Sequence, residues 1–112
     1  MNTLYNIQSI TQAENTYTAQ VVFNPEHIIY KAHFPNLPIT PGVILLQISH
    51  HCAEHILRQK IEIKTIKMIK FTNYIIPQTN KIFSFQIQIS DNTIKTTIAD
   101  EQTQYAKLQF SI

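Results

Sequence analysis

One histidine and one glycine are spaced so that a proton-transfer site could form around them. His33 precedes Gly42, the only glycine in the chain, by nine residues, and between them lie three of the five prolines, Pro35, Pro38 and Pro41. Proline fixes its own φ and restricts the residue before it, so this loop should hold His33 rigidly relative to Gly42. Free N–H groups at a helix start attract developing negative charge, and glycine lets a ligand approach the backbone. The spacing therefore favours proton removal beside a polarised carbonyl.

The helix that is expected to begin at this glycine covers about residues 42–58. Thr40 can cap it, Pro41 suits its first turn, and no further proline or glycine occurs before its end. Its first half is apolar on every side, with Val43, Ile44, Leu45, Leu46 and Ile48, whereas a surface helix carries one apolar stripe. We therefore expect the rest of the protein to enclose this half, and the polar second half to reach water.

Strands are expected on both sides of this helix. Residues 83–89 and 106–112 alternate between apolar and polar side chains, which predicts half-buried antiparallel strands. Further strand-like segments are residues 4–10, 16–23, 61–76 and 93–99. This order predicts a single α+β domain over residues 1–112. It has the hot-dog pattern, a curved antiparallel sheet of about six strands wrapped around one long central helix. Such a sheet leaves an edge and a face uncovered, which predicts a dimer.

Composition argues against several classes of function. The net charge is only +2, and the lysines are interleaved with isoleucine and threonine instead of forming a basic run, so nucleic-acid binding is not expected. The longest apolar stretch is far too short to span a membrane, and the first residues do not resemble a signal peptide. The single cysteine, Cys52, cannot form an internal disulfide, so a reducing cytoplasm is expected.

The segment His33-Phe34-Pro35-x-x-Pro38-Ile39-x-Pro41-Gly42-Val43 resembles the signature of the β-hydroxyacyl-acyl-carrier-protein dehydratases of fatty-acid synthesis. A looser similarity continues through the helix to Lys70-Phe71 and Pro77. The resemblance implies a hot-dog fold and elimination of water from 3-hydroxyacyl thioesters of acyl carrier protein or CoA, in fatty-acid or polyene and pigment biosynthesis. It implies no cofactor and no metal.

The resemblance also implies roles for individual residues. His33 matches the catalytic base that removes the α-proton, and Gly42 matches the residue whose N–H polarises the thioester carbonyl. Phe34 and Phe71 match apolar positions near the acyl tunnel. In such enzymes the histidine faces the helix of the partner subunit, so each site is shared across a homodimer or a heterodimer of related hot-dog subunits.

One departure bears directly on activity. Fourteen residues after the histidine, where this family has a glutamate or aspartate, the chain has Gln47. An amide cannot deliver a proton to the leaving hydroxide, and a positioned general acid contributes roughly 10²- to 10⁴-fold to rate. Gln47 can still orient the hydroxyl of the substrate or a water molecule.

Three explanations for Gln47 stay open. His51, one helical turn further on the same face, could act on the substrate as the acid. A related subunit could supply the carboxylate opposite His33. Alternatively, the chain could bind acyl groups without chemistry. A hot-dog thioesterase is a further alternative, although no acidic residue lies beside His33 in the sequence.

Other patterns have simpler interpretations. Residues 51–55 fit H-x-x-E-H, a zinc pattern, but no third ligand is apparent, and histidines near a helix C-terminus interact favourably with its dipole. Cys52 is expected to be a packed residue and not a nucleophile. The basic residues after the helix could face an acidic carrier protein, or could be an ordinary solvated surface; they are Arg58, Lys60, Lys64, Lys67 and Lys70.

Overall fold

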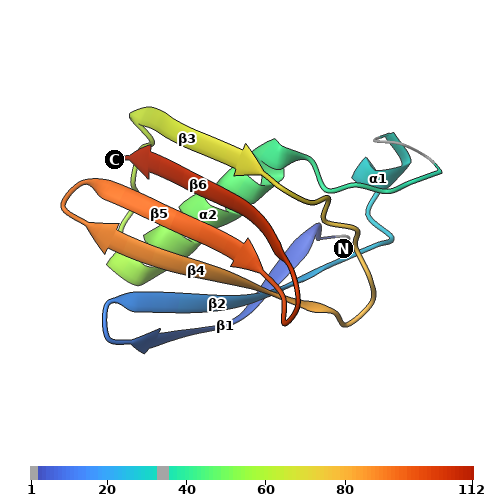
Figure 1. Ribbon diagram of the computed structural model, residues 1–112, viewed down its shortest axis with the longest axis horizontal. Helices are drawn as coiled ribbons and strands as arrows, with labels where there is room; N and C mark the ends of the chain where they lie inside the picture. The colour runs from blue at the N-terminus through green and yellow to red at the C-terminus, as the bar shows by residue number, and fades with distance from the viewer. Residues whose placement is uncertain (1–2, 33–35) are drawn as a thin grey trace.

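The computed structural model describes residues 3–32 and 36–112, and in it six antiparallel strands form one sheet with a long helix across one face (Figure 1). The strand order in the sheet is β1-β2-β4-β5-β6-β3. The predicted α+β hot-dog architecture is confirmed. In chain order the elements are β1 (Tyr5–Ala13), β2 (Thr16–Phe23), α1 (Ile29–Ala32), α2 (Gly42–Leu57), β3 (Thr65–Phe71), β4 (Ile82–Ser90), β5 (Thr93–Ala99) and β6 (Gln104–Ser111).

The core lies between α2 and the inner face of the sheet. Inward-facing residues alternate along the strands, and one row crosses β2, β4, β5 and β6 through the paired residues Ala19, Phe85, Ile98 and Ala106, all fully buried. The same row continues to Phe71 at the end of β3, which pairs with Ala106. Residues directly opposite in a ladder share a face, so the sheet directs the Phe71 ring toward α2.

Only one face of α2 is buried, contrary to the expectation that its apolar first half is enclosed on every side. Its buried residues, Leu45, Ile48, Ser49, Cys52 and Ala53, have the three- and four-residue spacing of a single helical stripe. Val43 is 70% exposed. The expectation was wrong because the sheet of one chain covers one side of the helix and leaves the other side open.

Both ends of α2 differ slightly from the prediction. Thr40 does not cap the helix, because its hydroxyl shares a hydrogen bond of 3.0 Å with the Tyr30 hydroxyl and its N–H donates to the Ile75 carbonyl at 2.9 Å. Pro41 occupies the cap position, without a side-chain hydrogen bond. The helix ends at Leu57, because Arg58 has a left-handed φ of 57° and its N–H donates to the Glu54 carbonyl.

An apolar edge strand is left uncovered. Every residue of β3 is exposed, including Ile66, Met68, Ile69 and Phe71, and within the described residues β3 pairs with β6 alone. The predicted uncovered edge is therefore present.

In the described part of the chain no helix combines the length and the hydrophobicity that crossing a bilayer requires.

A polar cluster fastens the turn between β5 and β6. The Asp100 carboxylate accepts hydrogen bonds from the Tyr105 hydroxyl and from the N–H groups of Gln102 and Thr103, and Lys81 Nζ lies 3.1 Å from it. These contacts, that of the Tyr105 hydroxyl first, hold the pKa of Asp100 well below its usual range. The cluster consists of Lys81 just before β4, Tyr105 on β6 and residues of the β5–β6 turn, and these residues have no part in the predicted active site.

Candidate active site

Gly42 is placed against an aromatic ring. An added Cβ at Gly42 would lie 2.4 Å from Cζ of Phe71 and 3.0 Å from Cε2 of the same ring, closer than carbon atoms pack. Its φ is not in the left-handed region, so close approach, and not backbone conformation, requires glycine here. Figure 1 shows β3 ending beside the start of α2. The structure therefore brings together two predicted site residues that are far apart in sequence.

A small apolar cavity opens where these two residues meet. Its volume is about 240 Å³, and it is lined by Ile39, Thr40, Pro41, Gly42, Leu45, Phe71, Asn73, Tyr74 and Ile75. Within residues 3–32 and 36–112, no oxygen accepts the N–H of Gly42. An uncommitted helix-start N–H beside an apolar cavity can polarise a carbonyl whose chain occupies that cavity.

The predicted base His33 and the predicted tunnel residue Phe34 lie outside the described residues. The segments before and after them are linked by a hydrogen bond between the hydroxyl of Tyr30, on α1, and the hydroxyl of Thr40, just before α2. Tyr30 is 3% exposed, so this hydroxyl pair lies within the protein. Sequence reasoning missed Tyr30, since nothing in its spacing indicates a partner ten residues away.

Gln47 lies on a different side of α2 from the Gly42 cavity. It follows Gly42 by five residues, which places it about 140° further round the helix axis at about 100° per residue. Gln47 is exposed and lines a separate cavity of about 490 Å³, formed by the α2 residues Gln47, His51 and His55 with residues 3–7 at the start of the chain. Within one chain, the structure therefore groups Gln47 with His51 and not with Gly42 and Phe71.

His51 has a partner that the sequence did not predict. Its Nδ1 shares a hydrogen bond with the hydroxyl of Tyr5, on β1, and the two ring centroids lie 6.0 Å apart. Burial raises the pKa of Tyr5, so the phenol keeps its proton at neutral pH. The strand pattern of residues 4–10 predicted β1 but gave no indication that its first tyrosine reaches α2.

In the zinc-like pattern, Glu54 is engaged in fold contacts. Glu54 accepts the N–H of Ile61 at 3.0 Å and lies 3.5 Å from His50, whose Nε2 donates to the Ile61 carbonyl. The Ile61 N–H, and then the nearby His50, Lys60 and His51, lower the pKa of Glu54. Among the residues that the structure describes, no three histidine, cysteine or acidic side chains are grouped as metal ligands.

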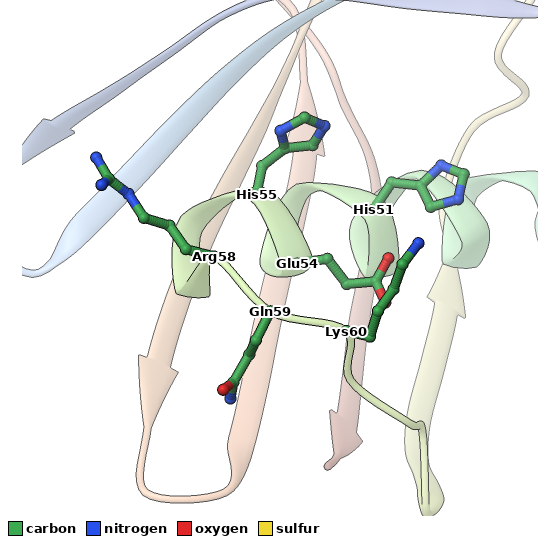
Figure 2. Close-up of a pocket in the computed structure, with 6 residues that line it drawn as sticks. All are labelled: His51, Glu54, His55, Arg58, Gln59 and Lys60. Carbon is green, nitrogen blue, oxygen red and sulfur yellow. The ribbon is translucent and has the colours of Figure 1, made fainter.

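The polar end of α2 borders an open cavity of about 630 Å³, lined by His51, Glu54, His55, Arg58, Gln59 and Lys60 (Figure 2). In Figure 2 the side chains of Arg58 and Gln59 point away from the Glu54 carboxylate, whereas that of Lys60 extends beside it. The basic groups do not converge on one point, so this cavity has no evident anion site. Docking of a carrier protein on Arg58, Lys60, Lys64, Lys67 and Lys70 stays a prediction.

Cys52 is fully buried in the core, and burial raises the pKa of its thiol to about 12. A thiol in that state is neither accessible nor nucleophilic. The interpretation of Cys52 as a packed residue agrees with these properties.

Comparison with known proteins connects this geometry to a described family. A family model for ApeI-like proteins, described as the ApeI dehydratase, matches residues 9–109. A chain of the dehydratase heterocomplex ApeI:P from Xenorhabdus doucetiae superposes with a TM-score of 0.82 and 19% identity, covering 95% of each chain. An uncharacterised protein from Erwinia carotovora subsp. atroseptica superposes with a TM-score of 0.63 and 19% identity, covering 97% of this chain and 91% of that one. At this identity, the two superpositions show a shared fold. No curated protein matches the chain.

Proposed function

Because the chain belongs to the ApeI-like dehydratase family, we propose that it eliminates water from 3-hydroxyacyl thioesters, carried by acyl carrier protein or CoA, in fatty-acid or polyene and pigment biosynthesis. The observation that carries the proposal is the N–H of Gly42, which no oxygen of the described residues accepts, beside an apolar cavity that Phe71 borders. This arrangement suits a thioester carbonyl with its acyl chain in the cavity.

In the proposed reaction the imidazole of His33 takes the proton from C2, the carbon next to the thioester carbonyl. Negative charge then develops on the carbonyl oxygen, where the Gly42 N–H stabilises it. The electron pair forms the C2–C3 double bond as the C3–O bond breaks, and the leaving oxygen takes up a proton, from His51 or from a carboxylic acid of a related subunit, and departs as water. Gln47 orients the leaving hydroxyl, His51 binds beside it, and Phe34 with Phe71 contacts the acyl chain.

We further propose that a second hot-dog subunit completes the site. Three observations support it: β3 is an exposed apolar edge strand, Val43 is exposed on α2, and Gln47 faces away from the Gly42 cavity of its own chain. A cavity of about 240 Å³ is also smaller than the roughly 300–1,000 Å³ of most ligand pockets. The similar ApeI:P chain comes from a heterocomplex, which favours a related but different subunit, with a homodimer as the alternative.

Gln47 favours one alternative function, that of a non-catalytic subunit. In this case the chain binds the acyl group or stabilises a catalytic partner, and the partner's own residues perform the elimination. The absence of a carboxylic acid at this position of the helix is the specific feature that favours it.

The experiment is an elimination assay with 3-hydroxyacyl thioesters of acyl carrier protein, using the purified chain alone and with a co-encoded hot-dog paralogue. The proposal expects enoyl thioester to form and His33→Ala to abolish its formation. If neither preparation changes the substrate and His33→Ala behaves identically, the proposal is wrong. Turnover in the complex that survives His33→Ala would favour the non-catalytic subunit, and release of free thiol would indicate a thioesterase.

A further inference from the structure

Beside Gln47, which has no transferable proton, the structure places the imidazole of His51, which can donate one. Gln47 and His51 are four residues apart on α2, so they occupy the same helical face, and both line the cavity that Tyr5 also borders. The Tyr5 hydroxyl bonds to Nδ1 of His51 across 46 residues of sequence. The His51 imidazole is therefore held in place by a residue of β1 and not only by its own helix.

The bond to Tyr5 suits a histidine that changes its charge during a reaction. When His51 is neutral, the phenol O–H donates to Nδ1, which leaves the ring proton on Nε2. When His51 is protonated, Nδ1–H donates to the phenol oxygen instead. The ring is thus held in both states. Within residues 3–32 and 36–112, Nε2 forms no hydrogen bond, and His51 lines the cavity that it shares with Gln47, so Nε2 is available to a substrate group in that cavity.

We propose that His51, positioned by Tyr5, is the general acid of the elimination and supplies the proton that Gln47 cannot. This inference rests on the proposed dehydratase function. The Nε2–H proton of the imidazolium passes to the leaving oxygen as the C3–O bond breaks, which forms water and leaves a neutral His51 whose remaining proton is on Nδ1, donated to the phenol oxygen. The base gains the C2 proton in the same turnover, and proton exchange with solvent restores both groups.

Other ionisable groups surround His51 and share any pH response. From β1 there is Tyr5, from α2 there are His50, Glu54 and His55, and after the helix there are Arg58 and Lys60. Glu54 and His50 are bonded to the backbone of Ile61. His55 lines the same two cavities as His51 but forms no hydrogen bond within the described residues. It is therefore a suitable control for a general electrostatic effect.

The test substitutes His51 and Gln47. Each variant is assayed in the full-length protein, together with the partner subunit if activity requires one. His51→Gln retains a side chain that can bond to Tyr5 but has no transferable proton, so we expect kcat to fall roughly 10²- to 10⁴-fold. The high-pH limb of the rate profile, which reports the acid, should disappear. Adding Gln47→Glu to this variant should raise kcat roughly tenfold or more above that of His51→Gln alone. The matched variant His55→Gln should stay within about twofold of wild type.

Tyr5 is tested as a positioning residue. Tyr5→Phe retains the ring but removes the hydroxyl, so we expect kcat to fall roughly tenfold, the rate equivalent of one hydrogen bond, with KM unchanged. The high-pH limb should shift, which loss of packing alone would not cause. Thermal unfolding of each variant checks that it is folded.

The outcomes separate the two proposals. If the wild-type protein turns over the substrate and His51→Gln does so at the same rate with the same pH profile, the role of His51 is refuted while the dehydratase function stands. If His55→Gln lowers the rate as much as His51→Gln, the effect is electrostatic and the inference is equally refuted. If neither the wild type nor Gln47→Glu eliminates water, the proposed function fails, and this inference fails with it.

Discussion

Replacing Gly42 by alanine would place a methyl carbon 2.4 Å from Cζ of Phe71. Carbon atoms pack at about 3.5–4.0 Å, so the tip of the ring would have to move by about 1 Å. Phe71 is 52% exposed at the end of an edge strand, and its ring can swing outward. The substitution should therefore displace the ring without breaking the fold.

The stability change that follows is small. Overpacking in a closed core costs about 1–3 kcal/mol, and the exposed ring puts Gly42→Ala at the lower end of that range. Alanine is up to about 1 kcal/mol more favourable than glycine in a helix, which offsets part of the cost at the start of α2. We expect the free energy of unfolding to change by less than about 1 kcal/mol, and kcat/KM to fall roughly tenfold or more because the methyl group obstructs the amide.

The assay is a double-mutant cycle with Phe71→Ala, measured by urea unfolding and by the elimination rate. Removing the ring removes the obstacle, so Gly42→Ala should be neutral or stabilising in the Phe71→Ala background, with a coupling of about 1 kcal/mol between the two positions. Equal destabilisation in both backgrounds would refute the argument that the ring requires glycine. An unchanged kcat/KM for Gly42→Ala would refute the role of the Gly42 amide.

Three further predictions concern the fold. Phe85→Ala should lower the free energy of unfolding by about 3–5 kcal/mol in urea titrations, because Phe85 is fully buried. Ile82→Ala changes a half-exposed residue of the same strand and should lower the free energy of unfolding by about 1 kcal/mol or less. Equal losses for the two variants would contradict the assignment of the core. The Cys52 thiol should react with a disulfide reagent at mildly alkaline pH only at the rate of unfolding, and rapid labelling of the native protein would contradict its burial. Asp100 has a lowered pKa in the folded state, so its contribution is present above its unfolded pKa of about 3.9 and is lost as pH falls below it. Asp100→Asn should therefore melt at a lower temperature than wild type at pH 7, with the gap narrowing in acid; a gap that is constant with pH would contradict this.

Local rules account for the parts of the structure that the sequence predicted. Period-two alternation along residues 83–89 and 106–112 depends only on neighbouring residues, and these segments form strands whose apolar residues face the core. The long helix begins at Gly42 as predicted, because proline and glycine punctuate the chain regardless of its distant surroundings.

Two predictions that depended on residues distant in the sequence were wrong: the helix cap at Thr40 and the enclosure of the first half of α2. Thr40 was a reasonable cap by local rules, but the fold gives its hydroxyl to Tyr30. The apolar first half of α2 indicated enclosure, yet Val43 is exposed, because apolar composition does not say whether the same chain or another subunit supplies the cover.

The sequence by itself determined the order of the six strands and the long helix, the single domain and the residues of the dehydratase-like motif, since these follow from local conformational preferences and from residue identity, whereas the short helix α1 was not predicted. Only the tertiary structure decided that Phe71 lies against Gly42, that Tyr5 holds His51, and that Gln47 faces away from the Gly42 cavity. Each of these depends on how the sheet aligns with α2. Contacts between segments tens of residues apart are set by the packing of the whole core and not by the preferences of either segment.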